Sequence, residues 1–144
     1  MLPEEGLLNY ILDRSRGCRH ITLIDPGKQS SEIATRRAIA SIEAGSSMIF
    51  IGGSTDTPDE IVHQTCQSIQ DALELQIFAA SQNPMVDEEK WKIPVVLFPG
   101  GAHAISPAAD GITFMMLMNS QSRKFLVGEQ LKGAPYLEKF GIEA

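Results

Sequence analysis

The sequence predicts an α/β protein built on a parallel sheet. Four apolar runs, at residues 20–25, 48–51, 94–98 and 111–116, each end in a cluster of Gly, Pro, Asp, Ser or Asn. Stretches with helical periodicity separate these runs. Strands that are buried on both faces have continuous apolar sequences, and in parallel α/β proteins the groups just past their carboxyl ends build the active site. The chain is therefore expected to form one edge of a catalytic mouth.

The first three helices are indicated by their start and stop signals. An apolar stripe after Pro3 predicts a helix over about 4–15, which stops before Gly17. A second helix begins near Ser31 and ends at Gly45, where a left-handed residue is wanted. A third should run to about residue 80, with Thr57 as its N-cap and Pro58 at its first position.

The remaining elements are shorter. Residues 81–93 are polar and are expected to form a surface excursion between the second and third strands. The fourth strand is expected over 111–116, followed by two short helices near 122–131 and 134–140. Strands that alternate with helices at this spacing imply βαβ units and a parallel sheet.

The number of strands defines the expected architecture. Four βα units would leave an open sheet with two unprotected edges, whereas functional groups after every strand are typical of a closed eight-stranded barrel of roughly 250 residues. No linker divides the chain. We therefore expect residues 1–144 to be a single domain that covers about half of such a barrel.

Composition excludes several classes of protein. The chain is 43% hydrophobic, with a formal net charge of −6 and a pI near 5.0, which argues against a broad binding surface for nucleic acid. Cys18 and Cys66 lie far apart, so neither a zinc site nor a disulfide framework is indicated. No signal peptide or membrane-spanning run is recognised. We expect a cytoplasmic protein without a transmembrane segment.

Asp25 and Ser54 are the candidate metal ligands. Asp25 ends the first apolar run and is followed by Pro26, which favours an extended backbone before the loop. Ser54 follows the second run, and neighbouring strand ends meet in space. Hard oxygen ligands suit Mg²⁺, which fills its remaining positions with water and substrate phosphate. The alternative is that Asp25 only makes a turn or caps the next helix.

Glycines and an amide make up the candidate substrate-binding residues. Gly52 and Gly53 remove two side chains, so their N–H groups could form an anion-binding nest for a phosphate, or the triplet with Ser54 could be a flexible turn. Gly100 lies in a Pro-Gly-Gly turn, where it either shapes the turn or leaves room for substrate. Asn119 either caps the following helix or binds a ligand.

Taken in order, these motifs resemble the geranylgeranylglyceryl phosphate synthase family, which includes the bacterial heptaprenylglyceryl phosphate synthases. The resemblance extends from about residue 19 to the C-terminus and is closest to the larger, group II branch. Each motif is common, but the ordered set is specific. The matching stretches are Arg19-His20-Ile-Thr-Leu-Ile-Asp25-Pro26, Ile51-Gly52-Gly53-Ser54, Leu97-Phe98-Pro99-Gly100, Ala109-Asp110-Gly-Ile-Thr-Phe-Met-Met-Leu-Met-Asn119-Ser120 and Val127-Gly128-Glu-Gln130.

The resemblance implies a TIM-barrel prenyltransferase of ether-lipid synthesis. In such an enzyme the 3-hydroxyl of sn-glycerol 1-phosphate attacks C1 of a polyprenyl diphosphate, geranylgeranyl or similar, and pyrophosphate leaves. Mg²⁺ stabilises the departing diphosphate. The family's metal ligands fall on Asp25 and Ser54. We further expect a homo-oligomer whose lipid product is delivered to the membrane.

The sequence departs from the family at two places. Gly27 stands where the family usually has an acidic or amide residue after the Asp-Pro pair. The family's fifth strand and later phosphate loops, with the acidic residue usually assigned to the hydroxyl, have no counterpart within residues 1–144. No catalytic residue is therefore assigned, and the isolated chain is expected to be feeble or inactive in transfer.

Two other functions stay open. A non-catalytic half-barrel could bind diphosphate, or it could pair with another half through its exposed sheet edges. A barrel enzyme of amino-acid or phosphosugar metabolism would keep the phosphate site but act on a different substrate.

Overall fold

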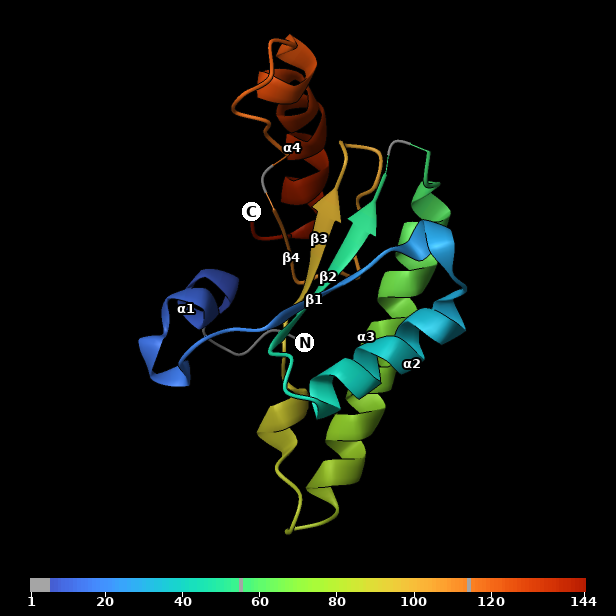
Figure 1. Ribbon diagram of the computed structural model, residues 1–144, viewed down its shortest axis with the longest axis vertical. Coiled ribbons are helices and arrows are strands. Elements are labelled where there is room, and N and C mark those ends of the chain that lie inside the picture. The colour runs from blue at the N-terminus through green and yellow to red at the C-terminus, as the bar shows by residue number, and fades with distance from the viewer. Residues whose placement is uncertain (1–5, 55, 114) are drawn as a thin grey trace.

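The computed structural model describes residues 6–54, 56–113 and 115–144. Its centre is a four-stranded parallel sheet with the strand order β1-β2-β3-β4 (Figure 1). The strands are β1 Ile21–Ile24, β2 Met48–Gly53, β3 Val95–Pro99 and β4 Gly111–Ile112. The α-helices are α1 Gly6–Leu12, α2 Ser31–Glu43, α3 Asp59–Ser81 and α4 Glu129–Phe140.

Helices α2 and α3 cover the outer face of the sheet. Apolar residues of α3 recur at helical spacing, and Val62, Cys66 and Ile69 are buried against the strands. The strand side chains at Ile51 and Leu97 point into the same core, in register with each other. This face holds the main hydrophobic core and fixes the positions of the first three strand ends.

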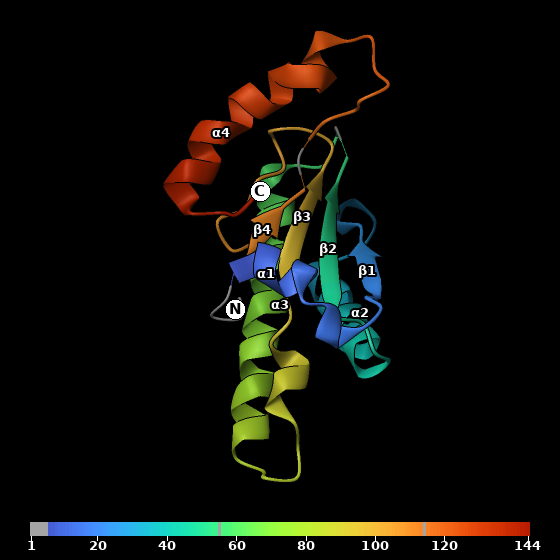
Figure 2. The same cartoon turned by 90° about the vertical axis from the view of Figure 1, so that its left-hand side faces the viewer.

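Helix α1 lies on the opposite, inner face of the sheet (Figures 1 and 2). Its Leu7 and Tyr10 form a small second core with Met48 and Val96. The carboxylate of Glu143 accepts the Leu7 N–H at 2.7 Å and the Leu8 N–H at 2.9 Å, as an acid should at a helix N-terminus. The upper part of the inner face, nearer the strand ends, stays open.

The predicted strand positions are confirmed for the first three runs, but the fourth strand is shorter than expected. Only Gly111–Ile112 form β4, with Thr113 adding one further bond, 2.9 Å to the Leu97 carbonyl. Phe114, within the predicted strand, lies outside the described residues. On the side of β4 away from β3, the described residues supply one parallel bridge, from Gly111 to Glu143.

The two helices expected near 122–131 and 134–140 are one continuous helical run. It begins with a π-helical turn at Lys124–Gly128 and continues as α4, with Pro135 inside the helix. Buried packing of Glu129, Gln130 and Gly133 accompanies a helix that continues across the predicted gap at residues 132–133. The run lies beyond the carboxyl ends of the strands (Figures 1 and 2).

Two predicted helix boundaries have opposite outcomes. Gly45 has a φ of +107° directly after the α2 C-cap, which confirms the left-handed stop. Thr57 is not the N-cap of α3, because Pro58 takes that position without a side-chain capping bond. None of the helices in the described part of the chain combines the length and the apolar character that crossing a membrane requires.

Candidate functional site: a pocket at the carboxyl ends of the strands

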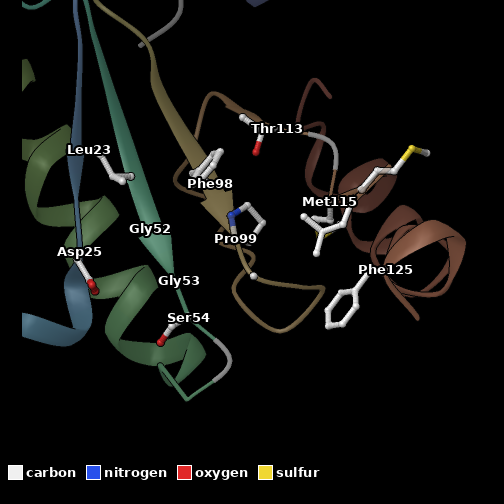
Figure 3. Close-up of a pocket in the computed structure, with 13 residues that line it drawn as sticks. Leu23, Asp25, Gly52, Gly53, Ser54, Phe98, Pro99, Thr113, Met115 and Phe125 are labelled. Atoms are coloured by element: carbon white, nitrogen blue, oxygen red, sulfur yellow. The ribbon is translucent and has the colours of Figure 1, made fainter. Parts of the chain in front are cut away.

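A pocket of about 390 Å³ opens at the carboxyl ends of the strands (Figure 3). All four strand ends contribute to it, through Asp25, Ser54, Gly100 and Thr113. A second pocket, of about 510 Å³, adjoins it and is also lined by Asp25 and Ser54. The structure therefore has a pocket where the sequence predicted a catalytic mouth, and both candidate metal ligands border both pockets.

One carboxylate oxygen of Asp25 has a structural role, and the other is available to a ligand. Its Oδ1 accepts the Gly27 N–H at 3.0 Å and so caps the short 3-10 helix Pro26–Lys28. Its Oδ2 lies 3.4 Å from Nζ of Lys28, whose side chain is 82% exposed. Such an exposed ion pair is weak, so Oδ2 can exchange this partner for a bound cation. The capping and the ligand interpretations of Asp25 are compatible.

Ser54 is oriented by Thr57, a residue that the sequence predicted to be the N-cap of α3. Its Oγ lies 3.0 Å from Oγ1 of Thr57, and the two hydroxyls hydrogen-bond. Thr57 is buried and lines the second pocket, so its hydroxyl holds the Ser54 side chain at the border of that pocket. The Thr-Pro pair is a common helix start, which is why the sequence predicted a cap here. The only sequence feature that pointed to a contact between Thr57 and Ser54 was their separation of three residues.

The donor set fits a hard cation such as Mg²⁺. Asp25 supplies a carboxylate oxygen and Ser54 a hydroxyl, and Figure 3 shows both side chains at the same end of the sheet, after β1 and β2. Mg²⁺ is commonly held by one or two protein groups with water and phosphate in its other positions. Within the described ranges, no three His, Cys, Asp or Glu side chains gather as a metal cluster. A two-ligand site is what these residues offer.

Gly52 and Gly53 do not form the predicted nest. They continue β2 in extended pairing with Phe98 and Pro99, and neither has a positive φ. A Cβ on Gly53 would lie 2.5 Å from the Cβ of Ala104, so only glycine fits there. A Cβ on Gly52 would meet nothing closer than 3.4 Å. Gly53 is thus needed for packing, whereas Gly52 keeps space open beside Asp25.

The other two predicted substrate-binding residues separate. Gly100 lines the pocket, and its N–H donates to the Gly53 carbonyl, which joins the ends of β2 and β3. Asn119 is exposed in a turn closed by the bond from Ser120 N–H to the Leu117 carbonyl, and it does not line the pocket. The sequence predicted Asn119 to lie close to the end of a fourth strand over 111–116. Because β4 is shorter than predicted, Asn119 lies farther from the strand end.

Cross-links between loops hold the rim of the pocket. His103 donates from Nε2 to the Ser54 carbonyl at 2.9 Å, which ties the loop after β3 to the loop after β2. Gln130 donates to the Met115 carbonyl and so holds the loop after β4 against the helix. Through these bonds the loops after β2, β3 and β4 are fastened to one another or to α4.

Glu129 is a buried carboxylate that sequence reasoning missed. Its Oε2 accepts the Ala102 N–H at 2.8 Å, and its Oε1 lies 3.5 Å from Lys132 and 3.9 Å from Lys124. The Ala102 bond, then the two lysines, lower the pKa of Glu129 below its ordinary value, against the effect of burial. A single acid in an amphipathic helix gives no signal of this role, because such residues are usually solvated.

Apolar side chains form one wall of the pocket. Phe98 and Leu23 project from the inner face of the sheet, and each is about half exposed. Phe98 stacks on Phe50 with ring centroids 5.7 Å apart, which continues the wall down the inner face. Met115 and Phe125 face this wall from the loop and the helical run after β4 (Figure 3). The pocket therefore joins hard oxygen donors to a hydrocarbon-lined surface.

Comparisons with known proteins agree on one group of relatives. The chain is 36% identical to the geranylgeranylglyceryl phosphate synthase of Thermofilum pendens over 137 residues, which cover 94% of this chain and 47% of that protein. It is 37% identical to the synthase of the same name from Methanococcoides burtonii, with 99% of this chain and 50% of that protein covered. The chain thus spans about half the length of the curated relatives it matches.

Solved structures give the same result. Wild-type GGGPS from Thermoplasma volcanium superimposes with a TM-score of 0.75 at 33% identity, covering 96% of this chain and 49% of that one. The Thermoplasma acidophilum synthase in complex with substrate sn-glycerol-1-phosphate has a TM-score of 0.74, with the same identity and coverage. The predicted fold class is confirmed, since the four-stranded parallel sheet corresponds to about half of the (β/α)8 barrel of these synthases.

The family follows from a match that covers most of the chain. A profile of the PcrB family matches residues 13–144, from the turn after α1 to the C-terminal residue. This span includes all four strands and every residue that lines the pocket. The chain therefore belongs to the PcrB family.

Proposed function

We propose that the chain is the donor-binding half of a Mg²⁺-dependent prenyltransferase of ether-lipid synthesis. The enzyme would transfer a polyprenyl group, geranylgeranyl or similar, from its diphosphate to the 3-hydroxyl of sn-glycerol 1-phosphate. The names of the relatives support this class of reaction. The observation that carries the proposal is one pocket in which Asp25 and Ser54 stand beside an apolar wall.

Each part of the pocket has a role in holding the donor. Asp25 and Ser54 would bind Mg²⁺, which when present neutralises the charge that develops on the departing diphosphate. Lys28 places an ammonium group 3.4 Å from Asp25 and adds positive charge at the same edge. Gly52 leaves room for phosphate oxygens to approach β2. Leu23 and Phe98 would contact the hydrocarbon next to the reacting carbon.

The acceptor site is proposed to lie in the other half of the barrel. One relative binds sn-glycerol-1-phosphate as substrate, and this chain matches 49% of that protein. Within residues 1–144 no carboxylate is assigned to the acceptor hydroxyl. We therefore expect a protein of residues 1–144 to bind the prenyl diphosphate without transferring it at rates near those of the family.

Calorimetric titration of a prenyl diphosphate tests the proposal. Binding is expected with Mg²⁺ and not with EDTA, and Asp25→Asn and Ser54→Ala should each weaken it by about tenfold or more. Asp71→Asn is the matched control, because Asp71 is an exposed carboxylate on α3 outside both pockets. Binding that ignores Mg²⁺, or that Asp71→Asn weakens equally, would contradict the assignment. Mass spectrometry of the products checks the absence of transfer.

The open inner face favours a second candidate, a half-barrel that pairs with another half. Leu23 and Phe98 are half exposed, although barrel interiors are normally filled. Pairing of two copies would cover this face and the sheet edges, in line with the expected homo-oligomer. Sedimentation velocity distinguishes a monomer from a paired assembly, and Leu23→Gln should dissociate such a pair.

A further inference from the structure

Residues 115–136, which run from the loop after β4 through most of α4, form a surface with two unusual properties; we call it the β4–α4 surface. Apolar side chains stand out from it: Met118 is 87% exposed and Leu131 69% exposed, with Leu117 and Val127 also exposed. Val127 and Leu131 lie one helical turn apart and so share a face of the helical run. The bond from Leu117 N–H to the Phe125 carbonyl holds the loop against the start of this run.

The second property is its charge. The β4–α4 surface contains three cations, Arg123, Lys124 and Lys132, and one acid, whereas the whole chain has a formal net charge of −6. That single acid is Glu129, which is buried against Ala102 and lies 3.5 Å from Lys132 and 3.9 Å from Lys124, so it offsets part of their charge. With three cations against one acid, the formal charge of the surface is still positive, on a protein that is acidic overall. Exposed apolar side chains beside lysine and arginine are the composition of helices that lie in the interface of anionic membranes.

The β4–α4 surface adjoins the pocket at the carboxyl ends of the strands. Met116, Leu117 and Phe125 line the pocket, so the surface continues into the site without a break. The helical run and its preceding loop lie at the end of the molecule to which the strand carboxyl ends point (Figures 1 and 2). A lipid whose hydrocarbon enters this pocket from a bilayer would cross these residues.

We infer that the β4–α4 surface docks the protein on an anionic lipid bilayer, with the apolar side chains in the interface and the cations on the headgroups. The inference rests on the proposed function, because docking would serve to collect a prenyl diphosphate, which is a membrane lipid. The experiment measures membrane binding directly and can therefore succeed or fail independently of the proposed function.

Co-sedimentation with vesicles tests the docking. The protein should bind vesicles of phosphatidylcholine with 30% phosphatidylglycerol, and bind pure phosphatidylcholine at least about fivefold less. Raising the salt from 50 to 500 mM should reduce the bound fraction, because the Debye length falls from about 14 Å to about 4 Å. Equal binding to both vesicles, or none to either, would overturn the inference.

Matched substitutions locate the surface. Met118→Ser with Leu131→Ser should lower binding about fivefold or more. The control pair is Met85→Ser with Leu75→Ser, since these side chains are 91% and 68% exposed and belong to the far part of α3 and the loop after it. Arg123→Gln with Lys132→Gln should remove the preference for anionic vesicles, whereas Arg36→Gln with Arg37→Gln on α2 should keep it. Equal losses in test and control pairs would overturn the inference.

Two readouts separate this inference from the proposed function. The variant with Met118→Ser and Leu131→Ser should still bind a short, water-soluble prenyl diphosphate in the absence of vesicles. The Asp25→Asn variant should lose diphosphate binding but still bind vesicles. Circular dichroism checks that each variant folds. Sedimentation velocity covers the remaining occupant: if the Met118 and Leu131 changes dissociate an oligomer that binds no vesicles, the surface is a protein interface and the docking assignment fails.

Discussion

The hydroxyl of Thr57, which belongs to a helix-start motif, supports Ser54, one of the two proposed metal ligands. Helix α3 begins at Asp59 without a side-chain cap, and the Thr57 hydroxyl is directed to Ser54 instead. Partners of this kind orient the groups that hold a metal, and their loss typically weakens metal binding about 10- to 100-fold. The stability of the helix start is thus given up for the geometry of the site.

Replacing Thr57 should separate positioning from packing. Thr57→Val keeps the volume of the buried side chain but removes the bond to Ser54, so Mg²⁺-dependent binding of a prenyl diphosphate should weaken about tenfold. Thr57→Ser keeps a hydroxyl and should restore most of the affinity. Titration of Mg²⁺ at fixed diphosphate measures both. Unchanged affinity in Thr57→Val would show that Ser54 needs no support.

Glu129 should make stability depend on pH in the acid range. Its pKa is lowered in the folded protein, so its contribution is present above the ordinary value of 4.5 and is lost as the pH falls through the folded pKa. Glu129→Gln keeps an acceptor for Ala102 but removes the charge, which should cost about 1 kcal/mol at pH 7. The difference from wild type should therefore shrink as the pH falls below 4.5 and through the lowered pKa of folded Glu129.

Urea unfolding between pH 3 and pH 7 measures this difference. Glu138→Gln is the matched control, because Glu138 is an exposed acid on the same helix. The free energy of unfolding of the control should follow that of the wild type at every pH. A Glu129→Gln protein whose stability loss is the same at pH 3 and pH 7 would contradict the role of the charge.

At the scale of elements, the two glycines at the end of β2 do different work. Gly53 has no room for a side chain because Ala104 of the next loop packs against it, whereas Gly52 points into the pocket beside Leu23 and Asp25. One glycine lets the loop after β3 approach the strand. The other keeps the site open.

Alanine at each glycine should therefore have a different effect. Gly53→Ala overpacks the contact with Ala104 and should lower the free energy of unfolding by about 1–3 kcal/mol. Gly52→Ala should change stability by less than about 1 kcal/mol but reduce diphosphate binding, since the new methyl group lies in the pocket. Denaturant unfolding and calorimetry on both variants check this, and each serves as the control for the other.

Elements that local signals define were predictable, and those that tertiary contacts define were not. The apolar runs gave the first three strands within about two residues, and Gly45 gave the end of α2. The length of β4 depends on its pairing with β3 on one side and on a bridge to Glu143 on the other, and local sequence does not specify either. The continuity of the helical run through Pro135 depends on packing against Met115 and Ile105, which no local pattern contains.

The candidate site divides in the same way. The common position of Asp25 and Ser54 at one pocket was predictable because both follow apolar runs that pair in a parallel sheet. Thr57 and Glu129 were missed because their partners, Ser54 and Ala102, lie on loops whose shape the sequence does not specify. Groups at strand ends are readable from a sequence, whereas groups that cross from one loop to another are not.

At the scale of the whole molecule, Glu143 fastens α1 to the sheet. Helix α1 has 7 residues, too few to be stable alone. Glu143→Ala should free it, so that hydrogen exchange of the amides in residues 6–12 speeds up at least about tenfold while exchange in α2 and α3 is unchanged. Glu138→Ala should leave exchange at α1 as in wild type. Equal protection of α1 in Glu143→Ala would show that Leu7 and Tyr10 suffice.

The same contact constrains the order of assembly during synthesis. Leu7 and Glu143 are separated by 136 positions, so during synthesis α1 cannot form this contact until those 136 residues have been added. Contacts between such distant positions close slowly, because a long loop must lose its freedom first. The bonds from α1 to Glu143 are therefore expected to form after the more local contacts between neighbouring strands and helices.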